Sequence, residues 1–448
     1  MPVILVTDVL VWLLAAAATG YAFYCRRHPH LAVPWARVFR STAAMASVVV
    51  LGVYVALGLL DSLHFRPELE KKDGEQKAYS SEVLSVLDLA LSHLRGRSEK
   101  TYSAPLATRS FAKEQIELPD GRQLRDFPRL RFGGAHLQDE GEWAGDVAKR
   151  MLTGIAVAAA LLFLIFLVMK IIRKRRPEIP WSAAYAAIAV LALLAGPAAA
   201  LSSGYHVLGT DKVGQDIFYL ALKSVRTSLV IGTLTTLVLL PVGIALGIAA
   251  GYFKGWIDDV IQYLYTTLNS IPGVLLIAAA VLMMQVYIDL HPEMFQTAVQ
   301  RADLRLLFLC IILGLTSWTG LARLLRGEAL KLSQLEYIQA AHAFGVRDTR
   351  ILARHILPNV SHIVILAMVM DFSGLVLAEA VLSYVGVGVD PSTNSFGTMI
   401  NAARMEMARE PVVWWALATA FTFMFALVLA ANLFADAIRD GFDPRVRM

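Results

Sequence analysis

Charged residues are scarce in this sequence. Asp, Glu, Lys and Arg make up 17% of the 448 residues, whereas about 25% is usual in soluble domains. Hydrophobic residues make up 57%, and the mean hydropathy is +0.57. A soluble core of this length does not need so much apolar side chain, so the surplus must face lipid. The net charge of +5 is explained by cytoplasmic Lys and Arg and requires no nucleic-acid partner.

Cysteine and catalytic signatures are nearly absent as well. Cys25 lies at the end of one apolar run and Cys310 lies within another, so no disulfide framework is expected. No Cys/His pairs occur at metal-ligand spacing. The sequence contains no G-x-x-x-x-G-K-[ST], H-E-x-x-H or G-x-S-x-G motif. We therefore expect no catalytic residue and no metal site, and this chain alone should not hydrolyse ATP.

Long apolar runs dominate what is present. Runs of about 20 residues recur, and each is long enough to cross a bilayer core of about 30 Å as a helix. Helices are expected throughout, because an open strand edge in lipid would leave backbone groups unsatisfied. The sequence predicts an all-α polytopic membrane protein with about nine transmembrane helices. These are expected over residues 3–24, 40–60, 151–171, 181–201, 226–252, 258–288, 304–325, 360–385 and 411–435.

Basic clusters predict the orientation of these helices. They follow the first and third spans, which places both loops in the cytoplasm. Alternation then puts the N-terminus outside and residues 336–358 inside. The first span could instead be a signal peptide, but its basic residues follow the apolar run rather than precede it. The clusters are Arg26, Arg27, Arg37 and Arg40, and Lys170, Arg173, Lys174, Arg175 and Arg176.

The longest polar region covers residues 61–149 and is expected outside the cytoplasm. Apolar residues recur at helical spacing from Val83 to Leu94, and Gly96 is a plausible end for this helix. The stretch Pro119-Asp120-Gly121 predicts the turn of a hairpin or loop. Two interpretations stay open for this insert. It is either a partly ordered region without chemistry or a docking surface for an extracytoplasmic partner.

A polar stretch lies between two apolar runs and contains charges, a mid-segment glycine and a terminal proline: "EYIQAAHAFGVRDTRILARHILPN" (336–359). Residues 328–344 suit a helix, and Gly345 suits the left-handed conformation that ends one. Asp348 is expected to cap a second short helix over 349–357, which Pro358 would stop. We predict two short helices that lie across the cytoplasmic face and are tied rigidly to the spans on either side.

This stretch resembles the hallmark loop of the membrane subunits of binding-protein-dependent ABC importers. That loop reads E-A-A, three residues, Gly, and an apolar L-P ending. Other stretches narrow the resemblance to the C-type permease of the peptide and nickel branch, namely "HVLGTDKVGQD", "GYFKGWIDD", "LSYVGVGVDPSTNSFGTMI" and "NLFADAIRDGFDPR", which together span roughly residues 200–445. Gln339 replaces the usual acid. The matching loop residues are Gln339, Ala340, Ala341, Gly345, Leu357 and Pro358.

The resemblance implies an organisation and a set of partners. Residues 202–448 would be a type I-like ABC importer permease core with its coupling loop at 326–358. The front half departs from the family pattern. The apolar runs and the polar region divide it into N-terminal transmembrane helices over 1–60, the insert over 61–149 and additional transmembrane helices over 150–201. The resemblance implies a multi-pass protein of the bacterial inner (cytoplasmic) membrane. Its partners would be a second permease, two cytoplasmic ATPases and an extracytoplasmic solute-binding protein. ATP and Mg would be bound by those partners, so no cofactor is expected in this chain.

Polar residues inside the spans are candidates for the solute pathway. Asp371 and Glu379 lie eight residues apart, about 12 Å along one side of a helix. Asp371 could contact solute or a gate, or form a buried hydrogen bond, whereas a structural role is favoured for Glu379. Asn269 and Ser270, followed by Pro272, could kink a span beside the pathway or be an ordinary membrane-helix irregularity. Two rival functions are an ion-coupled secondary transporter that uses the two acids and a non-transporting membrane scaffold.

Overall fold

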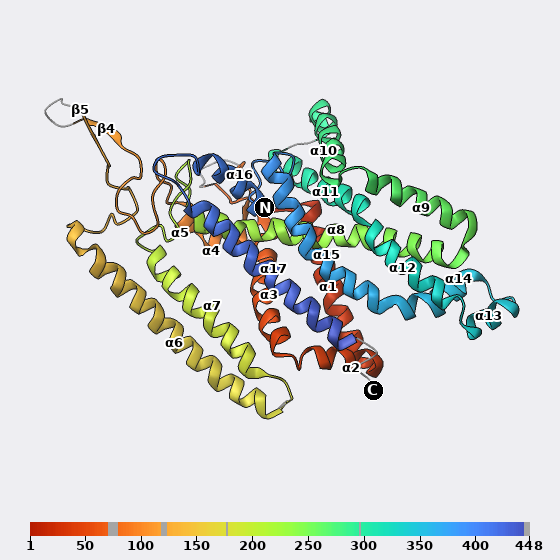
Figure 1. Cartoon of the computed structure of the whole chain (residues 1–448). Coiled ribbons are helices and arrows are strands. Elements are labelled where there is room, and N and C mark those ends of the chain that lie inside the picture. Colours follow the sequence, from red (N-terminus) through yellow and green to blue (C-terminus); the bar gives the residue numbers. More distant parts are fainter. Residues whose placement is uncertain (70–78, 118–122, 176–177, 295–296, 443–448) are drawn as a thin grey trace, which may run out of the picture. The chain divides into compact units, whose positions relative to one another are not determined.

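The structure is a computed structural model that describes residues 1–448 except 70–78, 118–122, 176–177, 295–296 and 443–448 (Figure 1). It is mainly helical, as predicted. The chain divides into two compact units. Unit 1 comprises Met1–Ile4, Ala36–Thr227 and Thr393–Leu433, and unit 2 comprises Leu5–Trp35, Ser228–Ser392 and Phe434–Met448.

Within the described residues, eight helical segments are long and apolar enough to cross a membrane, or up to nine if the bent pair α11 and α12 is one span. This agrees with the predicted number. They are α1 Val6–Arg27, α3 Thr42–Asp61, α6 Trp143–Arg175, α7 Trp181–Ser202, α8 Ile217–Phe253, α10 Gly273–Leu290, α15 Leu357–Val385 with the turns before it, and α17 Trp415–Phe442; the bent pair is α11 Ala298–Ser317 and α12 Thr319–Leu332. The remaining long helices are α2 Pro29–Val38, α9 Gly255–Ser270 and α16 Phe396–Glu406.

One predicted span is wrong. Residues 258–288 form two helices, α9 and α10, that are separated at Ile271 and Pro272. Ile271 is extended, with φ −91° and ψ 132°, as expected for a residue before proline. Pro272 has no N–H with which to continue the hydrogen-bond ladder of α9. The span predicted over 304–325 is bent by 40° between α11 and α12.

A small sheet in unit 1 ties the N-terminus to the insert. β1 (Pro2–Val3) pairs antiparallel with β2 (His64–Phe65), and β2 pairs antiparallel with β3 (Leu84–Ser85). The ammonium group of Met1 donates a hydrogen bond to the carbonyl oxygen of Arg66 over 2.8 Å. The N-terminus therefore lies beside the start of the insert.

The insert contains less continuous helix than predicted. Two short helices, α4 (Val86–Ala90) and α5 (Ser92–Arg95), replace the one helix expected up to Gly96. Ser85 and Asp88 form a capping box that starts α4 only at residue 86, so the preceding residues stay extended in β3. β4 (Glu114–Glu117) and β5 (Gln123–Asp126) pair antiparallel, which confirms a hairpin. The turn predicted at 119–121 lies outside the described residues.

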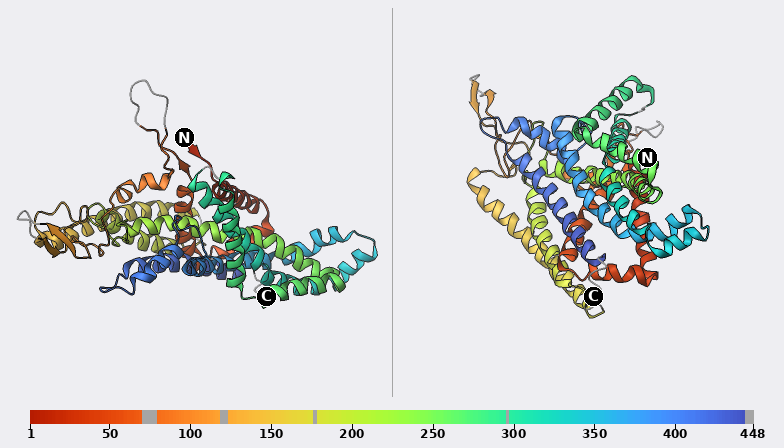
Figure 2. Two further views of the ribbon diagram at one scale, coloured as in Figure 1. Left: turned by 90° about the horizontal axis from the view of Figure 1, so that it is seen from above. Right: turned by 45° about the vertical axis from the view of Figure 1, so that its right-hand side comes forward.

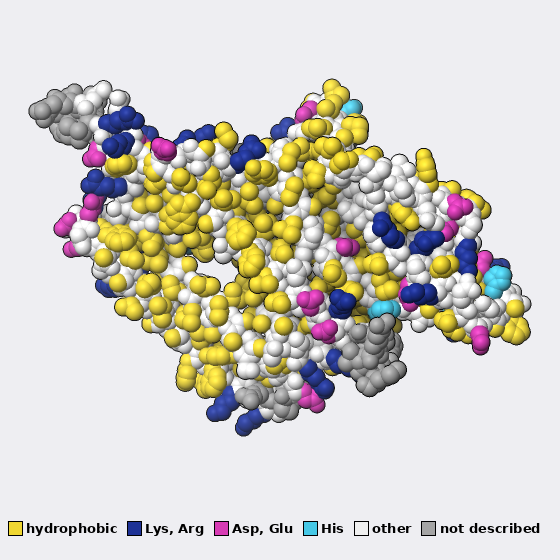
Figure 3. Space-filling model, viewed as in Figure 1, with side chains coloured by type: hydrophobic (Ala, Val, Ile, Leu, Met, Phe, Trp, Pro, Cys, Tyr) yellow, Lys and Arg dark blue, Asp and Glu magenta, His cyan; other side chains and the backbone are white. Residues whose placement is uncertain are grey.

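Helices α6 and α7 form an antiparallel hairpin in unit 1, seen from two further directions in Figure 2. Their backbones approach closely at two glycines. A Cβ atom on Gly154 would lie 2.6 Å from the carbonyl oxygen of Gly196. Small residues permit such close packing between membrane helices. Large apolar side chains of this hairpin stay exposed, including Leu152, Phe163 and Leu194, and hydrophobic side chains cover much of the face in Figure 3.

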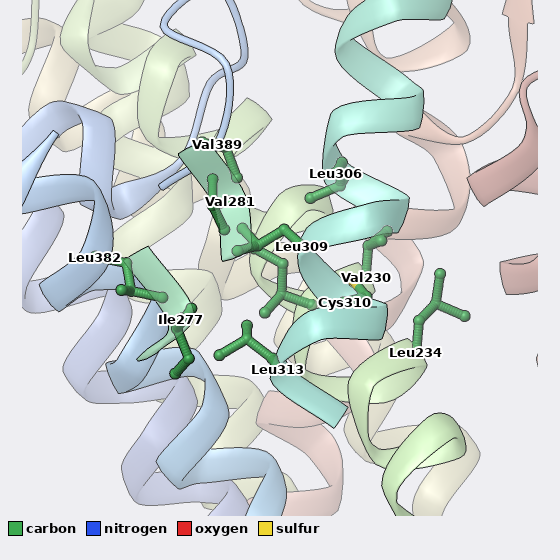
Figure 4. Close-up of a cluster of buried hydrophobic side chains, with 11 residues drawn as sticks. Val230, Leu234, Ile277, Val281, Leu306, Leu309, Cys310, Leu313, Leu382 and Val389 are labelled. Carbon is green, nitrogen blue, oxygen red and sulfur yellow. The ribbon is translucent and has the colours of Figure 1, made fainter. Parts of the chain in front are cut away.

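The core of unit 2 surrounds α11. Leu306, Leu309, Cys310 and Leu313 are almost fully buried against side chains of α8, α10 and α15 (Figure 4). Helix α1 is fixed to α11 by a carboxylate. Asp303 accepts hydrogen bonds from the backbone N–H groups of the first two helical residues of α1, at 2.9 and 3.2 Å, and thus caps an N-terminus that would otherwise leave donors unsatisfied. The start of α1 is thus held against α11, while much of its remaining surface stays exposed, including Leu13 and Phe23.

Candidate functional site

The loop singled out from the sequence joins α12 to α15 in unit 2. It contains α13 (Glu336–Ala343), α14 (Asp348–Ile351) and a π-helical turn (Leu352–Ile356) that runs into α15. In Figure 2, α13 and α14 lie at one end of the unit 2 ribbon. The helix predicted over 328–344 is interrupted at Ser333–Leu335, where Leu335 is extended. The break reorients α13, and Ile338 is buried with only 2% exposure.

Gly345 has the predicted conformation. Its φ is +75°, in the left-handed region that disfavours residues with a Cβ atom. The N–H of Val346 donates to the carbonyl oxygen of Ala341 over 3.1 Å, a bond of the Schellman type that satisfies an orphan carbonyl at the end of α13. Val346 packs against a buried cluster of unit 2. The glycine therefore both ends α13 and directs the chain back toward α8 and α12.

The second half of the loop departs from prediction, because Pro358 does not stop a helix. The π-helical turn continues into α15, with the N–H of Leu357 bonded to the carbonyl oxygen of Leu352. This wider turn accommodates a proline, whose ring would clash with the carbonyl of residue i−4 in a regular α-helix. Asn359 donates to the carbonyl oxygen of His355 over 2.6 Å. The loop is thus a direct extension of α15.

Asp348 does not cap α14, contrary to prediction. Arg347 occupies the N-cap position and makes no side-chain cap. The Asp348 carboxylate instead accepts a hydrogen bond of 2.7 Å from the hydroxyl of Tyr252, on α8. Asn359 also donates to the hydroxyl of Tyr337, on α13, over 3.2 Å. Both short helices are therefore fastened to neighbouring elements by polar contacts that the sequence did not reveal.

Apolar packing anchors the loop further. Ile351, Ile356 and Val360 are fully buried in a cluster with Leu325 of α12 and Leu239 of α8. Helices α8 and α12 approach closely because a glycine stripe lines α8. A Cβ atom on Gly247 would lie 2.6 Å from the carbonyl oxygen of Ala322, and one on Gly251 would lie 2.4 Å from that of Arg326.

An ion pair joins α12 to α9 near this packing. The guanidinium of Arg326 makes two hydrogen bonds of 2.6 Å to the carboxylate of Asp258, which belongs to the "GYFKGWIDD" stretch. Such bidentate geometry fixes orientation as well as distance. Together with the buried cluster, it connects α8, α9, α12 and the loop mechanically.

The outward surface of the loop carries one feature that the sequence analysis missed. Phe344, directly before Gly345, is 87% exposed. An aromatic residue beside a left-handed glycine between two short helices was the available signal. Of the predicted coupling residues, Gln339 and Ala340 are exposed, and Ala341 is half-buried against the cluster. The Gln339 amide donates to the carbonyl oxygen of Gln334 over 3.2 Å, and Leu357 and Pro358 are exposed at the start of α15.

The predicted pathway residues fall into two separate pairs. On α15, Asp371 is half-buried, and its carboxylate forms no hydrogen bond or ion pair with any residue that the structure describes. Glu379 is buried and accepts a hydrogen bond of 2.6 Å from Ser383. At the end of α9, Asn269 accepts a hydrogen bond from Thr319 over 3.2 Å.

Ser270 donates to the carbonyl oxygen of Thr267 over 2.7 Å, which satisfies a carbonyl group at the helix end. Within the described parts of the chain, no hydrogen bond or ion pair joins the α9 pair to the acids of α15. Over the same residues, no group of three or more His, Cys, Asp or Glu side chains is arranged to hold a metal ion.

A buried charged cluster in unit 1 organises the "HVLGTDKVGQD" stretch. The His206 ring lies between two carboxylates, 2.8 Å from Asp216 and 3.3 Å from Glu99 of the insert. Glu99 also accepts hydrogen bonds from the backbone N–H groups of Arg131, Phe132 and Gly133. Sequence analysis did not find Glu99, because nothing near it marks an acid that pairs with a residue 107 positions away.

The interactions in this cluster favour the charged forms of both His206 and Glu99. Burial alone would lower the pKa of His206, but the two carboxylates outweigh it and raise this pKa to about 9. Burial would raise the pKa of Glu99, yet hydrogen bonds from His206 and from three backbone N–H groups lower it to about 2. At neutral pH the structure therefore holds an imidazolium between two carboxylates, and this ion cluster fastens the insert to the stretch that precedes α8.

The sequence of this chain matches a known protein family and several of its members. Residues 243–448 match the family described as binding-protein-dependent transport system inner membrane component. The chain is 34% identical over 254 residues to a glutathione transport system permease protein of Pectobacterium atrosepticum, which covers 56% of this chain and 75% of that protein. It is 28% identical over 242 residues to an oligopeptide transport system permease protein of Mycobacterium tuberculosis, which covers 54% and 77%.

A third relative is a dipeptide transport system permease protein of Bacillus subtilis, 28% identical over 245 residues, with 55% of this chain and 70% of that protein covered. Among solved structures, an inward-facing conformation of the MetNI methionine ABC transporter covers 51% of this chain and 98% of the matched chain, with 15% identity and a TM-score of 0.39.

The membrane helices and these sequence matches define the class of protein, a multi-pass transmembrane permease subunit of an ABC importer. The chain belongs to the family of binding-protein-dependent transport system inner membrane components. This membership argues against both rival interpretations, the ion-coupled secondary transporter and the non-transporting scaffold. The relatives are permeases rather than enzymes, in agreement with the expectation that this chain carries out no covalent chemistry.

Proposed function

We propose that this chain forms half of a solute pathway in a bacterial inner membrane and that the loop over residues 336–358 couples the pathway to two cytoplasmic ATPases. A second permease would complete the pathway, and an extracytoplasmic binding protein would deliver the solute. ATP and Mg would be bound by the ATPases. The matched relatives are named for transport of glutathione, oligopeptides and dipeptides, so short peptides or related small solutes are the class that we assign.

One observation carries the coupling role, namely that the loop is rigidly continuous with a membrane helix. The segment from Asp348 to Val385 is a single helical run through the π-helical turn. Ile351 and Ile356 are fully buried, so its first turns are packed against α8 and α12. A force applied to α13 or α14 would therefore displace α15 as a rigid body, which is the kind of rearrangement that opens and closes pathways.

Asp371 is our candidate for contact with solute or gate on the moving helix. An intramembrane carboxylate is costly and usually faces protein or water. Since it has no hydrogen-bonding partner among the described residues, a water-filled pathway or another subunit would stabilise it. Glu379, held by Ser383, is assigned a structural role. Asn269 binds Thr319 and is assigned to joining α9 and α12 beside the pathway, with Ser270 completing the helix end.

The coupling role is tested at the left-handed glycine. Gly345→Val places a β-branched residue at φ +75° and adds a strain of about 1–2 kcal/mol. The surrounding spans supply the apolar area for insertion, so the protein should remain in the membrane. We expect the variant to lose bound ATPase during purification and to transport less solute.

A matched substitution on the same loop is the control. Gln339→Glu restores the acid usual in this family at an exposed position of α13 and should be tolerated. ATPase retention on the purified complex and solute uptake in cells are measured for both variants. If Gly345→Val keeps its ATPases and transports normally, the loop is not the coupling element.

A further inference from the structure

On the solvent-facing side of the loop over residues 336–358, an exposed aromatic side chain lies beside arginines. Phe344 is 87% exposed at the turn between α13 and α14. Single exposed apolar residues are common on protein surfaces and by themselves indicate little. Positively charged side chains next to Phe344 indicate that this exposed residue belongs to a binding surface.

Three exposed arginines follow Phe344, namely Arg347, Arg350 and Arg354. Arg350 and Arg354 lie four residues apart on one side of the helical run, and Arg347 is the extended N-cap residue directly before it. Ile351 and Ile356 on the other side are fully buried, which fixes that run with its arginines outward. We call this surface, Phe344 with the three arginines, the basic stripe.

None of the three arginines is neutralised within the described residues. Their guanidinium groups form no hydrogen bond or ion pair there. Two other arginines of unit 2 behave differently. Arg326 has two hydrogen bonds to Asp258, and Arg305 has Asp390 at 2.7 Å. The stripe therefore keeps its charge available for a partner.

The acids of the loop do not cancel this charge. Asp348 accepts the hydrogen bond from Tyr252 and lies 4.0 Å from His342. Glu336 lies at the first position of α13 and forms no ion pair within the described part of the chain. Figure 3 shows several Lys and Arg side chains over the end of unit 2 that contains α12 and α14, with Asp, Glu and His side chains among them.

We infer that the ATPase which binds this loop receives it in a groove with an acidic rim around an apolar pocket. The inference rests on the proposed function and adds the chemistry of the partner surface. Phe344 would fill the pocket, where burial of an aromatic side chain is strongly favourable. The three guanidinium groups would pair with carboxylates, whose planar geometry they match. Rigid anchoring of the loop lowers the entropic cost of this docking.

Anionic lipid headgroups are the competing occupant, because basic residues are common on the cytoplasmic side of membrane proteins. Two observations favour a protein groove. Arginines held on a buried helical run and at its N-cap provide directional pairing that a fluid headgroup layer does not require. In addition, Phe344 is carried on a turn that is held by hydrogen bonds and burial rather than on a mobile segment.

The experiment measures ATPase retention on the full-length tagged permease, purified from membranes of cells that express the whole transporter, over increasing KCl. One variant carries Arg347→Gln, Arg350→Gln and Arg354→Gln, and another carries Phe344→Ala. The control removes three exposed cytoplasmic charges elsewhere, by Arg26→Gln, Arg27→Gln and Lys174→Gln. All substituted residues of the loop are exposed, so each variant should insert and purify like the unmodified chain.

We expect retention on the unmodified chain to fall as KCl rises. The triple arginine variant should retain about ten-fold less ATPase at low salt and lose the salt dependence. Phe344→Ala should retain less at every KCl concentration while the salt dependence persists. The control should match the unmodified chain.

The alternatives give distinct results. Absence of ATPase on the unmodified chain at low salt would refute the proposed function itself. Equal, salt-independent retention on the unmodified chain and the triple arginine variant would overturn only the acidic groove. Normal ATPase retention by the arginine variant, together with weaker binding of the purified permease to phosphatidylglycerol vesicles, would also overturn it and assign the stripe to lipid.

Discussion

Removing the charge of Glu99 should loosen the insert measurably. In the structure Glu99 pairs with His206 and accepts three backbone N–H groups from residues 131–133. Lowering its pKa from 4.5 to about 2 corresponds to about 3 kcal/mol. The rise of the His206 pKa from 6.5 to about 9 comes from Asp216 as well as Glu99 and includes the same Glu99–His206 interaction, so the two values are not added. Glu99→Gln should therefore cost the local structure about 3 kcal/mol.

This loss should appear in hydrogen exchange at the amides that Glu99 holds. About 3 kcal/mol corresponds to faster exchange by roughly 100-fold where exchange occurs through local opening. The assay is mass spectrometry of peptides that contain residues 131–133, from protein in lipid nanodiscs. Glu82→Gln is the matched control, since Glu82 is an exposed acid of the same insert that pairs with Arg95, and exposed pairs contribute only about 0–1 kcal/mol.

The pH dependence has a defined sign. His206 has a raised pKa in the folded state, so its contribution is complete below pH 6.5 and is lost as the pH rises through 9. Glu99 has a lowered pKa, so its contribution is complete above pH 4.5 and is lost as the pH falls through 2. Protection in the unmodified chain, corrected for intrinsic exchange, should be greatest between pH 4.5 and 6.5. If Glu99→Gln exchanges like the unmodified chain throughout this range, the ion cluster does not hold the insert.

Three further outcomes are expected. Gly251→Ala should lower the stability of the purified protein by about 1–3 kcal/mol, because its Cβ would lie 2.4 Å from the carbonyl oxygen of Arg326. Gly327→Ala, with open space around it, is the control, and equal thermal melting of the two variants would contradict this packing argument. Asp371→Asn should reduce peptide uptake without reducing the amount of protein in the membrane, and unchanged uptake at all usable pH values would assign Asp371 to packing. Ser98→Cys should react with a membrane-impermeant thiol reagent in cells with permeabilised outer layers, whereas reaction only after inner-membrane lysis would show that the topology is wrong.

The sequence by itself determined the class of fold and much of the loop. Membrane spans can be predicted because apolarity over about 20 residues is a local property that bilayer thickness converts directly into helix length. The left-handed turn at Gly345 was equally local, since only the backbone of one residue is involved. Spacing of Gln339, Gly345 and Pro358 identified the loop for the same reason.

Local rules failed where neighbouring elements supplied a competing interaction. Pro358 was expected to end a helix, yet the π-helical turn before it widened the backbone and Asn359 bound the carbonyl of His355. Asp348 has the chemistry of a cap, but the Tyr252 hydroxyl was available as a partner. The span over 258–288 was apolar enough to be continuous, and Pro272 divided it.

Only the tertiary structure decided which charged side chains form ion pairs and which remain exposed without one. Glu99 and His206 are 107 residues apart, so their pairing depends on how the insert packs. Arg326 and Arg350 are both arginines in polar helical stretches, but one is fixed by Asp258 and the other is exposed without a carboxylate among the described residues. A one-dimensional pattern gives the type of side chain, whereas its free energy depends on the solvent and the partners that folding places around it.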